Sequence, residues 1–216
     1  MTRGSQGFPV LPIRVAIAAS LFAASMASNA VEFGTVLAEK SSLTFASRQM
    51  GVPVNGRFAR FTPQVVFDPA RPEAAQISVT VDIGSVDAGS KEANDEVVGK
   101  PWFNERLFPT ATFASTSVKA AGAPGSGKFT ASGTLTIKGK SQPVTAPFTF
   151  RTEGGNAVFD GSFLVKRIEF TVGEGAWTDV DAVANEVQVN FRVTAAPLAA
   201  VAKKVKSQPN SIRRNP

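Results

Sequence analysis

The sequence of 216 residues contains no cysteine, no histidine and no tyrosine. Without cysteine the chain forms no disulfide and lacks the attachment point of a bacterial lipoprotein, so apolar burial must stabilise the fold. Without histidine it has no Ser-His-Asp or Cys-His arrangement and no histidine ligand for a metal. The aromatic residues are 17 Phe and 2 Trp. Phe offers apolar area and no polar group, so most of these rings should be buried.

Other catalytic or metal-binding sets are also missing. Two groups of acids are the remaining candidates, namely Glu92, Asp95, Glu96 and Asp179, Asp181, Glu186. We interpret the first as a solvated helix face and the second as a polar loop. In "DVDAVANE", Val183 and Ala184 stand where a calcium loop needs a ligand and a glycine. "GAPGSGK" lacks the closing Lys-Ser/Thr of a phosphate loop. We therefore expect no enzyme, no metal and no cofactor.

Residues 1–30 read as a secretory signal peptide. They contain Arg3 and Arg14, no acid, an apolar run from Val15 to about Met26, and small residues ending in Ala30. This layout predicts cleavage after Ala30 and export, with the bacterial periplasm as the expected location. An uncleaved membrane anchor is the alternative, although the run is shorter than the roughly 20 residues that a span needs.

The basic excess lies at the two ends of the chain. Of 23 Lys and Arg, two fall in residues 1–30 and five in residues 197–216, which leaves 16 in residues 31–196 against all 17 acids. This distribution argues against a nucleic-acid partner. Residues 197–216 are predicted to be a basic flexible tail. Transient contact of the tail with anionic lipid headgroups is a second interpretation.

Residues 31–196 are predicted to form one all-β domain. Apolar residues alternate with polar ones from Leu43 to Phe45, from Ile77 to Ile83 and from Val187 to Val193. This period of two is typical of half-buried antiparallel strands. Turn-forming residues separate the strands at "AAGAPGSGK", "KGK" and "EGGN", which favours a barrel or a sandwich.

Two further local signals concern the first half of the domain. "VNGR" places Asn55-Gly56 as a predicted hairpin turn before the next strand. Residues 85–109 interrupt the strand pattern, and Ser90 to Gly99 resemble a short helix with Ser90 as N-cap and Gly99-Lys100-Pro101 as its end. Long loops in compact domains are often functional.

The pattern alone leaves open whether the barrel is hollow. Barrels of about eight strands can hold one small ligand. A Phe-rich wall could line an apolar cavity, yet a barrel packed solid would have the same composition. The alternatives are therefore a carrier of an apolar molecule and a structural or adaptor domain with a filled barrel.

Four segments, in this order, resemble the YceI-like family of bacterial exported proteins. They are "SSLTFASRQMGVPVNGRFARF", "VDIGSVDAGSKEANDEVVGKPWFNERLFPTATFAST", "GTLTIKGKSQPVTAPF" and "KRIEFTVGEGAWTDVDAVANEVQVNFRV". The resemblance implies a lipocalin-like antiparallel barrel with a short helix in a long connecting loop and an internal apolar tunnel. It also implies binding of polyisoprenoid or quinone-type lipids in the periplasm. Many members carry a histidine where Arg48 to Met50 stand here, so any headgroup contact at that place must differ.

The candidate ligand-binding residues follow from strand alternation and from this resemblance. Trp102 and Phe103 would lie near one end of the barrel, either as a plug or as tunnel lining, and Trp177 shares this ambiguity. Arg48, Asn55 and Asn94 fall in expected loops and are candidates for polar contacts near an opening. The full set of candidate apolar contacts is Phe45, Phe58, Phe67, Trp102, Phe103, Phe108, Phe113, Leu135, Phe148, Phe150, Phe163 and Trp177.

The resulting hypothesis is an exported protein that holds a long-tailed lipid for transport, storage or sequestration. A Phe-lined cavity without fixed polar anchors selects weakly, so a broad scavenger of antibiotics or stress-derived lipids is an alternative. The filled structural or adaptor barrel remains the third.

Overall fold

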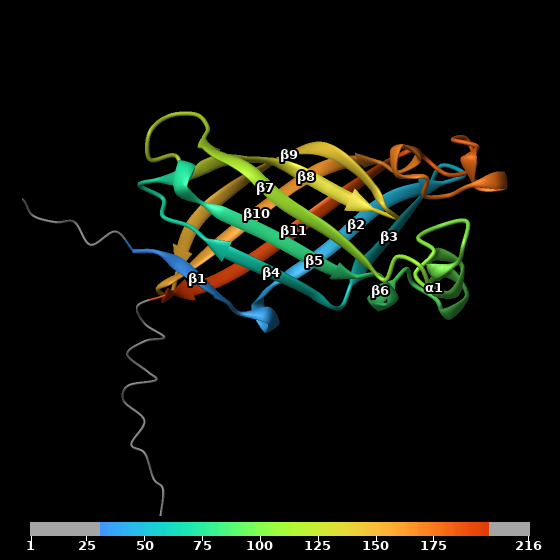
Figure 1. Ribbon diagram of the computed structural model, residues 1–216, viewed down its shortest axis with the longest axis horizontal. Helices are drawn as coiled ribbons and strands as arrows, with labels where there is room; N and C mark the ends of the chain where they lie inside the picture. The colour runs from blue at the N-terminus through green and yellow to red at the C-terminus, as the bar shows by residue number, and fades with distance from the viewer. Residues whose placement is uncertain (1–30, 199–216) are drawn as a thin grey trace, which may run out of the picture.

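The computed structural model describes residues 31–198, which form one antiparallel sheet of eleven strands (Figure 1). The predicted lipocalin-like antiparallel architecture is confirmed, and the short strands β1 and β6 account for part of the excess over the eight expected. The strands are β1 (Phe33–Val36), β2 (Ser42–Gln49), β3 (Val52–Phe58), β4 (Phe61–Val66), β5 (Gln76–Asp82), β6 (Val86–Asp87), β7 (Thr110–Ala120), β8 (Lys128–Ile137), β9 (Lys140–Glu153), β10 (Asn156–Lys166) and β11 (Glu186–Pro197).

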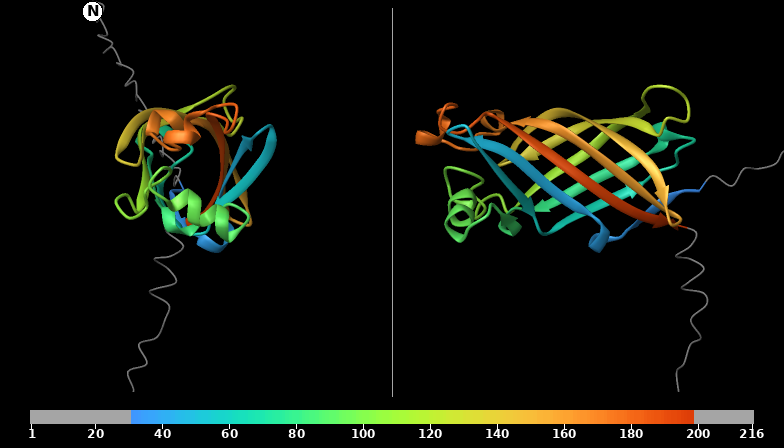
Figure 2. Two further views of the ribbon diagram at one scale, coloured as in Figure 1. Left: turned by 90° about the vertical axis from the view of Figure 1, so that its right-hand side faces the viewer. Right: turned by 180° about the vertical axis from the view of Figure 1, so that it is seen from behind.

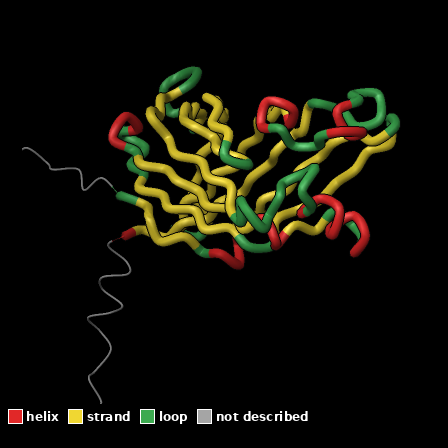
Figure 3. Tube along the Cα trace, turned by 45° about the vertical axis from the view of Figure 1, so that its right-hand side comes forward, coloured by secondary structure: helices red, strands yellow, loops and turns green. Residues whose placement is uncertain are grey.

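The sheet curls so that its two edges approach each other (Figures 2 and 3). The hydrogen-bonded order runs β4-β5-β7-β8-β9-β10-β11-β2-β3-β6. β1 pairs with β11, and Phe33 of β1 also exchanges backbone hydrogen bonds of 2.9 and 3.0 Å with Phe67, just after β4. β1 therefore joins the two sides of the sheet at one end, which we call the closed end.

The other end carries the single α-helix of the described residues, α1 (Lys91–Val98). The expected helix is confirmed, because Ser90 Oγ accepts a hydrogen bond of 3.1 Å from Ala93 N, and Gly99 caps the other end. We call this end the mouth. It comprises α1, residues 99–109, the turn between β2 and β3, and residues 167–184, which include the 3-10 turns η4 (Arg167–Phe170) and η5 (Gly175–Thr178) (Figure 1).

The hairpin prediction at Asn55-Gly56 is wrong. Both residues lie inside β3, and the turn falls at Met50-Gly51, whose φ angles are 48° and 78°. Gly56 pairs with Phe45 across the ladder, and a Cβ at Gly56 would overlap the Phe45 ring. The glycine therefore provides space for an aromatic side chain on the neighbouring strand, which the Asn-Gly turn rule does not consider.

The other predicted turns are found where expected. Residues 121–127 join β7 to β8, Lys138-Gly139 join β8 to β9, and Gly154-Gly155 join β9 to β10. The remaining 3-10 turns are η1 (Ala38–Lys40), η2 (Pro72–Ala74) and η3 (Ile83–Ser85). In the part of the chain that the structure describes, no helix is both long enough and apolar enough to cross a membrane. The predicted signal peptide and nearly all of the predicted tail lie outside the described residues.

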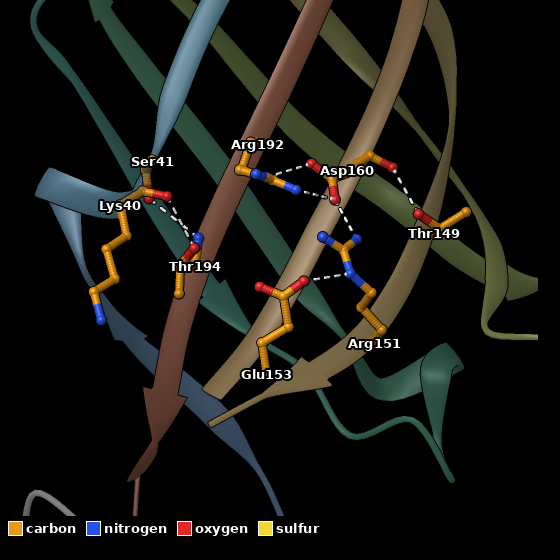
Figure 4. A network of polar contacts seen from close by, with 8 residues as sticks. All are labelled: Lys40, Ser41, Thr149, Arg151, Glu153, Asp160, Arg192 and Thr194. Carbon is orange, nitrogen blue, oxygen red and sulfur yellow. Dashed lines mark hydrogen bonds and ion pairs between the residues drawn. The ribbon is translucent and has the colours of Figure 1, made fainter. Parts of the chain in front are cut away.

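The outer face of β9, β10 and β11 carries a polar network (Figure 4). Asp160 accepts hydrogen bonds of 2.7 and 3.2 Å from Nε and Nη2 of Arg192, and it also pairs with Arg151. Arg151 Nε in turn lies 2.7 Å from Glu153. The hydrogen bonds from Arg192 and Arg151 lower the pKa of Asp160. Polar residues thus cover the outside of the wall, while the apolar phase of each strand faces inward.

Candidate functional site: an apolar cavity

The barrel encloses an apolar cavity of about 630 Å³. This volume lies within the roughly 300–1,000 Å³ that is typical of ligand sites. Inward-facing side chains from most strands form its wall, and residues of α1, η4 and η5 contribute at the mouth. The sequence left open whether the barrel is hollow or filled, and the structure shows that it is hollow over part of its length.

Most of the predicted apolar contacts do line this cavity. Those on strands have the inward phase that alternation predicts, and the aromatic residues of the mouth segments reach the cavity at its open end. Phe58 contacts Phe45 at a ring distance of 5.7 Å and Phe103 at 6.2 Å, so these three form a continuous patch of wall. The predicted residues on the lining are Phe45, Phe58, Trp102, Phe103, Phe113, Leu135, Phe148, Phe163 and Trp177, together with the polar Arg48.

Five predicted contacts lie elsewhere. Phe67 and Phe150 belong to the packed closed end, and Phe108 packs over the turn glycine Gly139. Asn55 is exposed on β3, because its neighbours in the strand take the inward phase. Asn94 Oδ1 accepts a hydrogen bond of 2.6 Å from Ala88 N, so its side chain fixes the entry into α1.

A cluster of phenylalanines blocks the closed end. Phe67 has no exposed surface, and its ring lies between 5.1 and 6.1 Å from four others, mostly edge to face. Such aromatic contacts add to the area that they bury. The cluster, which we call the plug, consists of Phe33, Phe67, Phe129, Phe148, Phe150 and Phe159. The cavity therefore ends blindly, and Phe148 and Phe159 form part of its floor.

The mouth is built around a carboxylate shared by two indoles. Glu96 Oε1 on α1 accepts hydrogen bonds of 3.1 Å from Trp102 Nε1 and 3.0 Å from Trp177 Nε1. The two indole rings lie 5.5 Å apart. Trp102 and Trp177 are the only tryptophans of the chain, and both line the cavity. They therefore act as lining at the mouth, whereas the plug lies at the opposite end.

Lys138 forms hydrogen bonds with two loops of the mouth, residues 99–109 and 171–178. Its side chain is only 6% exposed, and Nζ lies 3.1 Å from Lys100 O, 2.8 Å from Thr171 O and 2.6 Å from Glu174 Oε2. Pro101 O also accepts hydrogen bonds from the backbone N–H groups at positions 173 and 174. The hydrogen bond from Lys138 lowers the pKa of Glu174. Residues 99–109 and 171–178 consequently form one fixed rim.

Arg167 is a buried cation on the cavity lining. It is 3% exposed and donates hydrogen bonds to the carbonyl oxygens of residues 172, 173, 183 and 184 at distances of 2.6 to 3.3 Å. Its guanidinium carbon lies 5.7 Å from the Trp102 ring, within cation-π range. Burial lowers the pKa of Arg167, but a guanidinium remains charged at neutral pH.

Sequence reasoning missed several lining residues. Phe61, Phe159 and Phe191 have the inward phase of their strands, so the same alternation rule would have found them. Ser47 shares the phase of Phe45 and was overlooked because it is polar. Glu96 and Arg167 carry no sequence signal, because their positions depend on how the mouth segments pack.

A shallower hollow lies along the seam between β2–β3 and β4–β5. The side chains of Leu43, Phe58 and Phe61 line both this hollow and the cavity. They are therefore the layer that separates the cavity from the outer side of the seam, where no ladder joins β2 to β4.

The chain belongs to a known family. Residues 35–195 match the model of the YceI-like domain, which confirms the resemblance seen in the sequence. A UPF0312 protein of Shewanella oneidensis is 36% identical over 129 residues, which are 59% of this chain and 66% of that protein. One from Pseudomonas fluorescens is 33% identical over 144 residues, or 63% and 71%. The matches thus span about two thirds of the length of these relatives.

Solved structures show the same fold. BcnA of Burkholderia cenocepacia is 42% identical, with a TM-score of 0.71 over 74% of this chain and 99% of that one. A polyisoprenoid binding domain from Saccharophagus degradans is 16% identical, with a TM-score of 0.59 over 77% and 99%. At this identity the second likeness concerns the fold alone.

Proposed function

We propose that the protein holds the long apolar tail of a polyisoprenoid or quinone-type lipid in its cavity, for transport, storage or sequestration. The observation that carries the proposal is an apolar cavity of about 630 Å³ with a plugged floor and a single polar end. Membership of the YceI-like family, and a shared fold with the Saccharophagus degradans domain that is named for polyisoprenoid binding, support the tail chemistry. The described residues offer no catalytic arrangement that would favour an enzyme.

Burial of the tail against the apolar wall provides enough free energy to bind such a guest. Each CH₂ group removed from water contributes about 0.8 kcal/mol, so a five-carbon isoprene unit contributes roughly 3–4 kcal/mol. Micromolar binding requires about 8 kcal/mol. Three or four units therefore supply it and leave a surplus for the cost of association. Affinity should increase with tail length until the tail reaches the plug.

The proposal is tested by identifying the lipid that co-purifies with the protein from its own periplasm, using native mass spectrometry. A titration with lipids of increasing tail length should show rising affinity followed by a plateau. The absence of any bound lipid, together with no dependence on tail length, would contradict the proposal.

A cavity-filling variant makes this test specific. Val79 lines the cavity, whereas its neighbour Thr80 is exposed on the outer face of β5. Val79→Trp should move the plateau to shorter tails, because the larger side chain occupies part of the guest's volume. Thr80→Trp adds the same indole outside and should leave the plateau unchanged.

A broad scavenger of hydrophobic compounds is the second candidate, favoured by the scarcity of polar groups on the wall. Comparing the affinities of a polyprenyl quinone and of unrelated apolar drugs separates the two. Near-equal affinities support the scavenger, because a purely apolar wall discriminates weakly.

We further propose that the guest enters from a membrane surface in the periplasm. Met50 and Val180 are 75% and 52% exposed, and Met50 N donates to Ala182 O, so both lie on one side of the mouth. Met50→Ser with Val180→Ser should slow transfer of a fluorescent lipid from phosphatidylcholine vesicles. Val31→Ser, two residues before β1 at the closed end, should not, although Val31 is also exposed. Cell fractionation and a mature N-terminus at Val31 test the location.

A further inference from the structure

Polar side chains on the cavity lining gather at one end. Arg48 and Gln49 come from the tip of β2, Glu92 and Glu96 from α1, and Arg167 from η4, all of them at the mouth. The lining near the plug consists of Val65, Ala131, Ala146, Phe148, Phe159 and Val193. The cavity is therefore polar at the mouth and apolar near the plug. A guest with one polar end matches this distribution in only one orientation, with its polar end at the mouth.

Ser47 presents a polar atom without a partner. Its Oγ is buried, and no hydrogen bond to it is found among the described residues. Ser47 follows Leu43 and Phe45 in the inward phase of β2 and lines the cavity close to the mouth. A buried hydroxyl usually has a hydrogen-bond partner, because leaving it unpaired costs free energy. An oxygen atom of a guest would supply one.

Arg167 provides a second, independent donor. Its five N–H groups make four hydrogen bonds to backbone carbonyls, which leaves one N–H of Nη2 unassigned. No carboxylate among residues 31–198 lies within ion-pair distance of it. A cation buried without an acid favours a nearby hydrogen-bond acceptor, whether a neutral carbonyl or an oxyanion.

We propose that the guest lies with a hydrogen-bond-accepting oxygen at the mouth, next to Ser47 and Arg167, and with its tail toward the plug. The inference rests on the proposed function and adds the orientation of the guest and the chemistry of its polar end. A carbonyl and a carboxylate or phosphate oxygen share this chemistry.

The two tryptophans make the orientation measurable in the unaltered protein. Both lie at the mouth, and the chain contains no tyrosine that would add to the emission. Stearic acid with a nitroxide next to its carboxyl group should quench most of the fluorescence at saturation. Stearic acid with the nitroxide next to its terminal methyl should quench far less. Stronger quenching by the methyl-end label would overturn the proposed orientation.

Ser47→Ala tests the chemistry of the polar end. It should weaken binding of stearic acid and of its methyl ester about two- to tenfold, since a hydrogen bond is lost, and leave an alkane of equal length unaffected. Ser42→Ala is the matched control, because Ser42 lies on the same strand with the outward phase and lines no part of the cavity. Circular dichroism and urea midpoints establish that both variants fold.

The outcomes separate this inference from the proposed function. If Ser47→Ala binds both the acid and the ester more weakly than wild type does, a neutral carbonyl oxygen is sufficient as the acceptor. If only binding of the acid is weakened, the acceptor is an oxyanion. Equal affinities of wild type and variant for acid, ester and alkane would overturn the inference while leaving lipid binding intact. Failure of these probes and of a polyprenyl quinone to bind would overturn both.

Discussion

The closed end and the mouth of this barrel use aromatic residues in opposite ways. At the closed end, Phe67 contacts four other rings and is completely buried. At the mouth, Trp102 and Trp177 are half-buried, line the cavity and donate their indole N–H groups to Glu96. Phe has no polar atom to satisfy, whereas Trp can bridge an apolar interior and a wet rim.

This difference shows how one wall can serve both stability and binding. Rings that interlock bury the most area per residue but leave no space for a guest. Rings that face an empty volume lose contacts on one side, so they contribute less to folding and remain available to a ligand. The chain therefore has its tightest packing at one end and its cavity beside it.

The largest expected effect concerns the plug. Phe67→Ala should lower the free energy of unfolding by about 3–5 kcal/mol, because it removes a fully packed ring. Phe163→Ala should cost less, since Phe163 is only partly buried and faces the cavity. Urea denaturation of the two variants measures the comparison. Equal losses would show that the plug is packed no more tightly than the wall.

A smaller effect is expected at the rim of the mouth. Lys138→Met removes the donor shared by the two mouth loops and leaves carbonyl oxygens at positions 100 and 171 without it. We expect a loss of about 1–3 kcal/mol and faster hydrogen exchange in residues 99–109 and 171–178. Lys140→Met, at an exposed position after the same turn, is the control. Unchanged exchange in both loops would argue against Lys138 as their link.

The fold was largely predictable because alternation, turn residues and helix caps are local signals. The period of two identified β2, β5 and β11, and Ser90 with Gly99 bounded α1. The failure at Asn55-Gly56 has a long-range cause. The glycine accommodates Phe45 on another strand, and no local rule distinguishes that need from a turn.

The site was predictable only in its apolar part. Strand phase found Phe45, Phe113 and Phe163, because inward positions of a barrel face one shared interior. It could not separate cavity from plug, so Phe67 and Phe150 were assigned to the lining. That distinction depends on where β1 crosses to the segment after β4, through the bridge from Phe33 to Phe67.

The smallest expected effect lies outside the wall, in the ion network near the closed end. Hydrogen bonds from Arg192 and Arg151 hold the pKa of Asp160 below its ordinary value of 3.8. Its contribution to stability is therefore fully present above pH 3.8 and is lost as the pH falls through the lower value of the folded state. Asp160→Asn should be less stable than wild type at neutral pH, with a difference that shrinks in acid.

Thermal unfolding from neutral pH to below 3.8 measures this convergence. Asp181→Asn, an exposed acid at the mouth with no ion pair among the described residues, provides the comparison and should show little difference at any pH. If the two variants behaved alike, the outer network would add nothing to the closed end, and its greater stability would rest on the plug alone. If only Asp160→Asn converges with wild type in acid, the closed end is stabilised from both faces of its wall, whereas the mouth depends on Lys138 and its loops.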